Sequence, residues 1–93
     1  MLTYAYDVQN VELQESVNGE DVEFRIRLIG DASLDERMRN IQKDFEQNDV
    51  LTDVMSYAFK NRTYQFIVRK DFYVDFVLSL MKYRILLRVE WDQ

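Results

Sequence analysis

The chain has 93 residues and a formal net charge of −5; 47% of its residues are hydrophobic and 31% are charged. This composition is typical of a single folded domain over residues 1–93 and excludes a largely disordered chain. Histidine and cysteine are both absent, which excludes disulfides, thiolate metal sites and catalytic groups that depend on imidazole.

Composition also limits the expected location and partners. No apolar segment is long enough to span a bilayer, the first ten residues do not resemble a signal peptide, and the lack of cysteine favours the cytoplasm. An acidic protein is poorly suited to bind phosphate backbones, so we expect no nucleic-acid partner. Because no segment could span a bilayer, we also expect no membrane partner. The charge is uneven: residues 1–50 have a net charge of −7 and residues 51–93 of +2. This asymmetry either comes from charged side chains scattered for solubility or orients a protein partner or a second copy.

The first half of the chain begins with two predicted strands. Asn18-Gly19 predicts a two-residue hairpin turn of type I′, which joins a strand ending near Val17 to one starting near Asp21. The alternation of the first strand slips near Gln9-Asn10, as a β-bulge or a break between two short strands would cause, and we expect the bulge. Alternation in the next strand predicts that one set of side chains faces the core: Val22, Phe24, Ile26 and Leu28.

A helix follows the Gly30 loop. Ser33 and Glu36 have the spacing of a capping box, so we expect the helix to begin at Ser33 and to end near Asn48. Its apolar residues repeat at spacings of four, three and four, which predicts a surface helix with a narrow buried stripe. The stripe comprises Leu34, Met38, Ile41 and Phe45.

The second half of the chain predicts two strands, a helix and a last strand. Val50–Phe59 and Arg62–Arg69 are rich in β-branched and aromatic residues, with a turn expected at Lys60-Asn61. Asp71 is expected to cap a second helix, whose apolar residues surround most of its circumference, so it should be deeply covered. The last strand is expected from Ile85 to Trp91.

The predicted order is ββαββαβ, which indicates an α+β fold with an antiparallel-rich sheet and two helices on one face. The last six elements match the ferredoxin-like layout, here with an extra N-terminal strand. In the usual strand order the strand at residues 22–29 is internal, yet the Asn18-Gly19 hairpin requires the first strand beside it. Either the strand order differs from the usual one, or the first strand pairs elsewhere.

Candidate binding residues lie on the predicted sheet. The face directed away from the core is expected to bear Arg25, Arg27, Arg69 and Arg88, together with Gln65, Ile67 and Leu86. These arginines either pair with acids such as Glu23 and Glu90 across strands or bind an acidic protein segment or a second subunit. Tyr4 and Tyr6 are either ordinary half-buried strand residues or part of an edge strand that docks or self-pairs.

The inventory of reactive side chains favours binding over catalysis. Without histidine and cysteine, and without a nucleophile motif, we expect no enzyme activity, and no carboxylate pair has the spacing of a calcium loop, so we expect no metal and no cofactor. The expected function is a noncatalytic protein-binding or regulatory module, with a protein partner or as a homodimer. Two alternatives remain: a small-molecule sensor that uses the Gly30 loop, and an acidic decoy that inhibits a nucleic-acid-binding protein.

Overall fold

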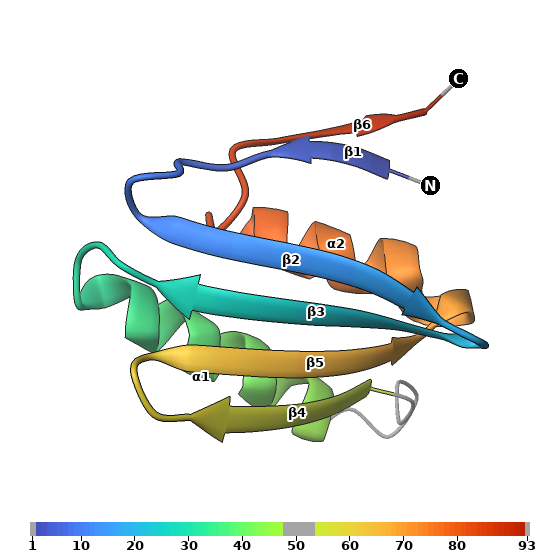
Figure 1. Ribbon diagram of the computed structural model, residues 1–93, viewed down its shortest axis with the longest axis horizontal. Coiled ribbons are helices and arrows are strands. Elements are labelled where there is room, and N and C mark those ends of the chain that lie inside the picture. Colours follow the sequence, from blue (N-terminus) through green and yellow to red (C-terminus); the bar gives the residue numbers. More distant parts are fainter. Residues whose placement is uncertain (1, 48–53, 93) are drawn as a thin grey trace.

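The computed structural model describes residues 2–47 and 54–92, which form a four-stranded sheet with two helices on one face and a separate two-stranded ribbon (Figure 1). The elements are β1 (Leu2–Ala5), β2 (Val11–Asn18), β3 (Asp21–Leu28), α1 (Ser33–Glu46), β4 (Val54–Phe59), β5 (Thr63–Arg69), the 3-10 turn η1 (Lys70–Phe72), α2 (Tyr73–Lys82) and β6 (Arg88–Trp91). The sheet has the order β2-β3-β5-β4, and β1 pairs with β6 in the ribbon; all pairs are antiparallel. The predicted α+β class is confirmed.

The strand order departs from the ferredoxin-like layout at one edge. β3, β5 and β4 are neighbours, and the chain passes from β3 through α1 to β4, as a split βαβ unit requires. The remaining edge of β3 is occupied by β2, and β6 pairs with β1 outside the sheet. A two-residue connection forces β2 to lie beside β3, so the position that the last strand would take is filled.

The predicted bulge near Gln9-Asn10 is wrong, because the chain breaks there into two strands that belong to different sheets. The backbone N–H groups of Asn10 and Val11 both donate to the Asp7 carbonyl at 2.9 Å, and the Gln9 N–H donates to Asp7 Oδ1. The alternation slips because a turn at Asp7 separates β1 from β2.

The β2–β3 hairpin forms where it was predicted, with its turn one residue later. Asn18 pairs with Asp21, so the two turn residues are Gly19 and Glu20. Gly19 has a φ of 64°, and it is the one residue of this turn with a positive φ. Glycine with positive φ at the first turn position is the pattern of type II′ rather than of the predicted type I′.

Helix α1 begins at Ser33 as predicted, but the capping box does not form. The Ser33 side chain makes no capping hydrogen bond; instead Asp31 Oδ1 accepts the Ser33 backbone N–H at 3.0 Å. The helix ends at Glu46, and the predicted end near Asn48 lies outside the described residues. All four residues of the predicted stripe are buried.

Helix α2 is buried on one side only. It begins at Tyr73, and no side chain, including the predicted cap Asp71, bonds its N-terminus. Leu78 and Met81 are 50% and 38% exposed, so the expectation of deep cover all round is wrong. The helices of the described residues form one layer, and no described element covers the outer side of α2.

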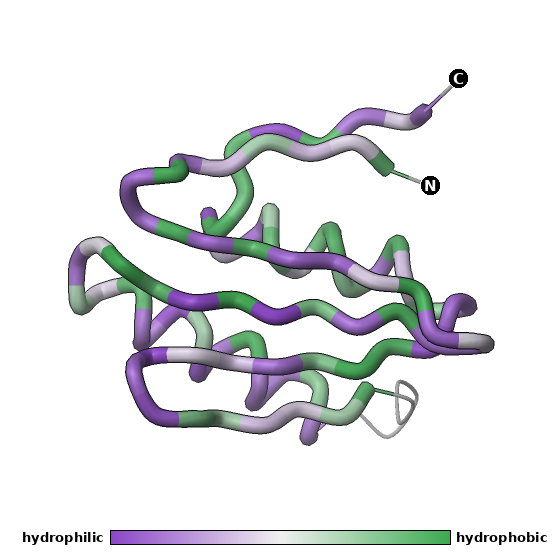
Figure 2. Tube along the Cα trace, in the orientation of Figure 1, coloured by the Kyte–Doolittle hydropathy of each residue, from purple (hydrophilic) through white to green (hydrophobic). Residues whose placement is uncertain are grey.

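The core lies between the sheet and the helices. Along β3, apolar and charged residues alternate, which Figure 2 shows as alternating green and purple, and Val22, Phe24 and Ile26 are fully buried. The Phe76 ring of α2 lies at the centre, with its centroid 4.7 Å from that of Phe24 and 4.8 Å from that of Phe66. The predicted parity of β3 and β5 is confirmed, because their core-facing residues pack against both helices.

Candidate protein-binding surface

One face of the four-stranded sheet is left uncovered by the helices (Figure 1). The strand registers place on it every second residue of each strand. We call this surface the open face. It comprises Glu12, Gln14, Ser16 and Asn18 of β2, Asp21, Glu23, Arg25 and Arg27 of β3, Thr63, Gln65, Ile67 and Arg69 of β5, and Met55, Tyr57 and Phe59 of β4.

The three residues of β4 form an apolar strip at the edge of the open face, which we call the β4 strip. Met55, Tyr57 and Phe59 are 52%, 42% and 49% exposed. Sequence reasoning missed this strip because β4 lacks a clear polar side. Val54, Ser56 and Ala58, which alternate with the strip residues, are no more polar than the strip itself.

Arg25 joins the β4 strip to the centre of the open face. Its guanidinium carbon lies 5.6 Å from the centroid of the Phe59 ring, within the range of a cation–π interaction. Among the described residues no carboxylate forms an ion pair with Arg25. The arginine is therefore held beside an aromatic ring with its charge still available to a partner.

The positive charge of Arg27 is balanced by the carboxylate of a neighbouring residue. Its Nε and Nη2 atoms donate to the two carboxylate oxygens of Glu12 on β2, both at 3.0 Å, and this hydrogen-bonded pair raises the pKa of Arg27. The interpretation in which cross-strand acids pair with the arginines is therefore right for Arg27, although the acid is Glu12 and not Glu23.

The predicted set of four arginines does not share one face. Arg69 is exposed on the open face at the end of β5, opposite Asp21. Arg88 lies in the ribbon, where its Nε atom is 3.5 Å from Glu90 Oε1, and Leu86 is buried with 1% exposure. The placement of Arg88 and Leu86 was wrong because the last strand does not join the sheet.

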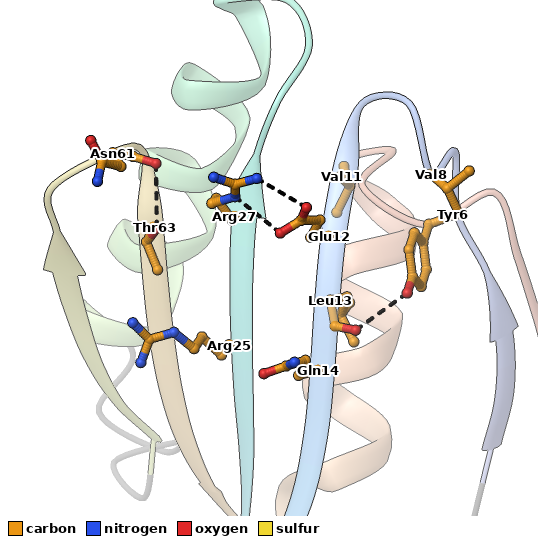
Figure 3. A pocket seen from close by; sticks show the side chains of 10 residues that line it. All are labelled: Tyr6, Val8, Val11, Glu12, Leu13, Gln14, Arg25, Arg27, Asn61 and Thr63. Atoms are coloured by element: carbon orange, nitrogen blue, oxygen red, sulfur yellow. Dashed lines mark hydrogen bonds and ion pairs between the residues drawn. The ribbon is translucent and has the colours of Figure 1, made fainter.

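The open face is hollowed near β2, as Figure 3 shows. A groove of about 530 Å³ runs from Arg25 and Arg27 across β2 to Tyr6 and Val8 in the β1–β2 connection. A second hollow of about 510 Å³ shares Gln14 and Arg25 with it. The two hollows together make the β2–β3 half of the open face concave.

Tyr4 and Tyr6 are placed by the structure between the ribbon and β2, not on an open edge. The Tyr4 hydroxyl donates to Glu15 Oε1 at 2.7 Å, and the Tyr6 hydroxyl donates to the Leu13 carbonyl at 3.2 Å. The Tyr73 hydroxyl of α2 also donates to Glu15, at 3.1 Å. Burial and the Glu15 carboxylate raise the pKa of Tyr4 and bring the pKa of Tyr73 to about 12.

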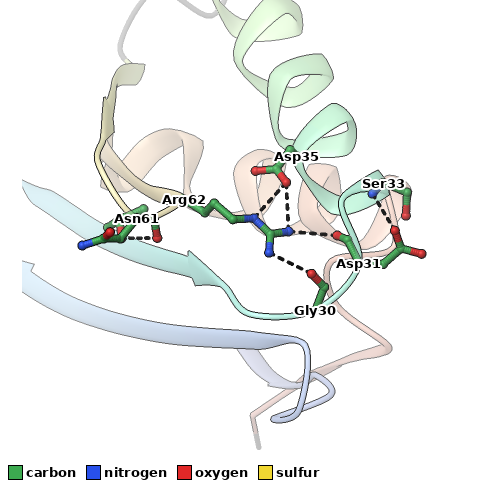
Figure 4. A network of polar contacts seen from close by, with 7 residues as sticks. Gly30, Asp31, Ser33, Asp35, Asn61 and Arg62 are labelled. Atoms are coloured by element: carbon green, nitrogen blue, oxygen red, sulfur yellow. Dashed lines mark hydrogen bonds and ion pairs between the residues drawn. The ribbon is translucent and has the colours of Figure 1, made fainter.

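The Gly30 loop is filled by the protein's own side chains (Figure 4). The Arg62 guanidinium donates to the carbonyls of Gly30 and Asp31 at 2.8 and 2.9 Å and to Asp35 Oδ2 at 2.9 Å. A Cβ atom on Gly30 would lie 2.0 Å from Oδ1 of Asn10, so Asn10 occupies the other side of the loop.

Further chemistry is scarce in residues 2–47 and 54–92. In these ranges no three acidic side chains gather closely enough to hold a metal ion. Nor does any described helix have the length and apolar character needed to cross a membrane. No protein-family model, curated protein or solved structure matches the chain.

Proposed function

We propose that this protein is a noncatalytic protein-binding module whose binding surface is the open face, with the β4 strip at one edge as its apolar part. The main support is the exposure of three large apolar side chains beside an arginine. Met55, Tyr57 and Phe59 are each between 42% and 52% exposed, and Arg25 lies over the Phe59 ring. Aromatic residues, methionine and arginine are enriched where protein interfaces are most buried.

The charge around the β4 strip supports a protein partner with acidic groups. The segment Val54–Arg69 contains no acidic residue and three basic ones, although the whole chain has a net charge of −5. Two of the basic residues, Lys60 and Arg69, are exposed. A partner with an apolar patch and an acidic rim would complement this surface, because complementary charge speeds encounter and disfavours wrong partners.

The two alternative functions have less support. A small-molecule sensor needs open space at the Gly30 loop, where Arg62 and Asn10 already lie. An acidic decoy needs its carboxylates on one surface, whereas Glu12 pairs with Arg27 and Glu15 lies between tyrosines.

The experiment that tests the proposal compares Arg25→Glu with Arg88→Glu in capture from an extract of the cells that make the protein. Both variants reverse one exposed arginine, but only Arg25 lies on the open face. We expect Arg25→Glu to reduce the amount of a specifically captured protein by about tenfold or more, since a hot-spot residue contributes about 2 kcal/mol. Arg88→Glu is expected to retain the partner.

The opposite result would count against the open face. Equal capture by both variants would mean that the partner binds elsewhere on the molecule. Loss with Arg88→Glu alone would move the binding surface to the β1–β6 ribbon. Circular dichroism of both variants verifies that each is folded before the comparison is made.

A further inference from the structure

The two edges of the four-stranded sheet differ in whether another described element lies beside them. β2 is flanked by the ribbon, the Tyr6 hydroxyl bonds the Leu13 carbonyl, and charged residues line the strand (Figure 1). β4 pairs with β5 on one side, and no described strand pairs with its other side. The edge at β4 is therefore the one that the described part of the molecule leaves open.

β4 also lacks the features that protect edge strands from pairing. Such strands usually contain charged residues, proline or a bulge, because an open edge presents a row of unpaired N–H and C=O groups. Val54–Phe59 contains no charged residue and no proline, and its register with β5 runs without interruption from Val54 to Phe59. This edge is chemically suited to accept another strand.

We infer that β4 pairs antiparallel with β4 of a second copy, so that two chains share one eight-stranded sheet. This inference goes beyond the proposed function, because it concerns the edge of β4 and not the open face, and it names a second copy of the chain as the occupant of that edge. Pairing of the same edge from both copies is isologous, so it closes as a dimer and leaves no open β4 edge from which a filament could grow.

The β4 strip selects one register for this pair. Residues directly opposite each other in an antiparallel pair lie on the same face, so a strip residue must face a strip residue. Centring the two-fold axis on Tyr57 places Tyr57 opposite its own copy and Met55 opposite Phe59 of the second chain. This register matches every strip residue, whereas centring on Ser56 leaves Phe59 without a strip partner.

Charge does not oppose the pair. In the Tyr57 register, the two Lys60 residues lie six positions apart along the joint strand pair, a separation of roughly 20 Å. This exceeds the screening length of about 8 Å at physiological salt. Because the paired strand is short, the interface falls in the small class, and we expect a dissociation constant on the order of micromolar.

Single-cysteine variants test the register, since the natural chain has no cysteine to interfere. Tyr57→Cys places two thiols on directly opposite residues, about 4.5 to 5.5 Å apart at Cα, which a disulfide can span. Met55→Cys is the matched control, because Met55 belongs to the same strip and is similarly exposed. In the proposed pair its two copies are offset by four residues, roughly 13 Å.

Under mild oxidation we expect Tyr57→Cys to give at least about tenfold more disulfide-linked dimer than Met55→Cys, because the thiols are held at high effective concentration. A mixture of Met55→Cys and Phe59→Cys should give the mixed dimer, which covers the case that loss of Tyr57 weakens pairing. Equal cross-linking of Tyr57→Cys and Met55→Cys, or none in any variant, would overturn the inference. Either result would leave the capture experiment on Arg25 unaffected, since Arg25 lies on β3 and not on the pairing edge.

Discussion

Arg62 holds three parts of the chain together through one side chain. It is the last residue of the β4–β5 turn, adopts a positive φ of 56°, and donates to the carbonyls of Gly30 and Asp31 and to the Asp35 carboxylate. Its side chain is 35% exposed and that of Asp35 is 19% exposed, so the pair is partly shielded from water. The β4–β5 turn is thereby fastened to the start of α1.

Arg62→Ala is therefore expected to lower the free energy of unfolding by about 2 kcal/mol, because it removes hydrogen bonds to a charged group and leaves two carbonyls without this donor. Arg69→Ala removes an exposed arginine from the same hairpin and should change stability by less than about 0.5 kcal/mol. Urea denaturation measures both values. Equal effects of the two substitutions would show that the Arg62 contacts contribute nothing to stability.

Glu15 of β2 connects this strand to both the ribbon and α2. It accepts hydrogen bonds from the hydroxyls of Tyr4 and Tyr73, and burial together with this carboxylate raises the pKa of both tyrosines above the usual 10. The folded state therefore keeps these phenols protonated at a pH where the unfolded chain has begun to ionise them. Their contribution to stability is complete below pH 10 and is lost as the pH rises through the folded-state pKa.

We expect the free energy of unfolding to fall steadily from pH 10 to pH 12, the pKa that Tyr73 reaches in the folded protein. Glu15→Gln removes the carboxylate that favours the protonated phenols, so its stability should depend less steeply on pH over this range. Chemical denaturation at several pH values checks both slopes. Identical slopes for the natural protein and Glu15→Gln would contradict the assigned role of Glu15.

At the scale of elements, the spacing of apolar residues correctly predicted which side of a strand or helix is buried. Alternation along β3 identified its buried side, and the spacing of Leu34, Met38, Ile41 and Phe45 identified the buried side of α1. Caps were less predictable. Ser33 and Glu36 have the spacing of a capping box, but the residue that accepts the backbone N–H of Ser33 is Asp31, which lies outside the box. Several residues can satisfy the same free N–H group, and sequence alone does not rank them.

Contacts between residues far apart in the sequence could not be predicted from the spacing of apolar residues. Gly30 does not have a positive φ, and the need for glycine comes from Asn10, twenty residues earlier, whose side chain lies where a Cβ atom would stand. The exposed side of β4 was equally hidden, because both sets of its alternating residues are mainly apolar. The β4 strip could be recognised only after the register with β5 was known.

At the scale of the whole molecule, the position of β6 decides the composition of the open face. The ferredoxin-like layout would have placed β6 beside β3 and brought Arg88 onto the sheet. The hairpin between β2 and β3 fills that position, so the face retains Arg25, Arg27 and Arg69 but not Arg88. The sequence revealed this conflict, but the choice between a changed strand order and a first strand paired elsewhere depends on long-range packing.

The same topology leaves the sheet with one flanked edge and one bare edge. β2 lies beside the ribbon, while the uncharged β4 lies at the opposite side of the sheet with its strip of Met55, Tyr57 and Phe59 exposed. The binding surface of this protein is therefore expected to include the β4 edge as well as the open face. The β4 edge is the part of this surface at which we expect a second copy of the chain to bind.

The most direct test is the mass of the natural chain in solution, measured by sedimentation equilibrium over a wide range of concentration. We predict that the mass rises from 11.3 kDa toward twice that value, and that Val17→Lys, at an exposed position of β2, behaves in the same way. Tyr57→Lys should remain a single chain, because it sets two like charges directly opposite each other at the centre of the pair. A natural chain that stays at 11.3 kDa at every concentration, or a Tyr57→Lys variant that dimerises equally well, would contradict the proposed pairing of β4.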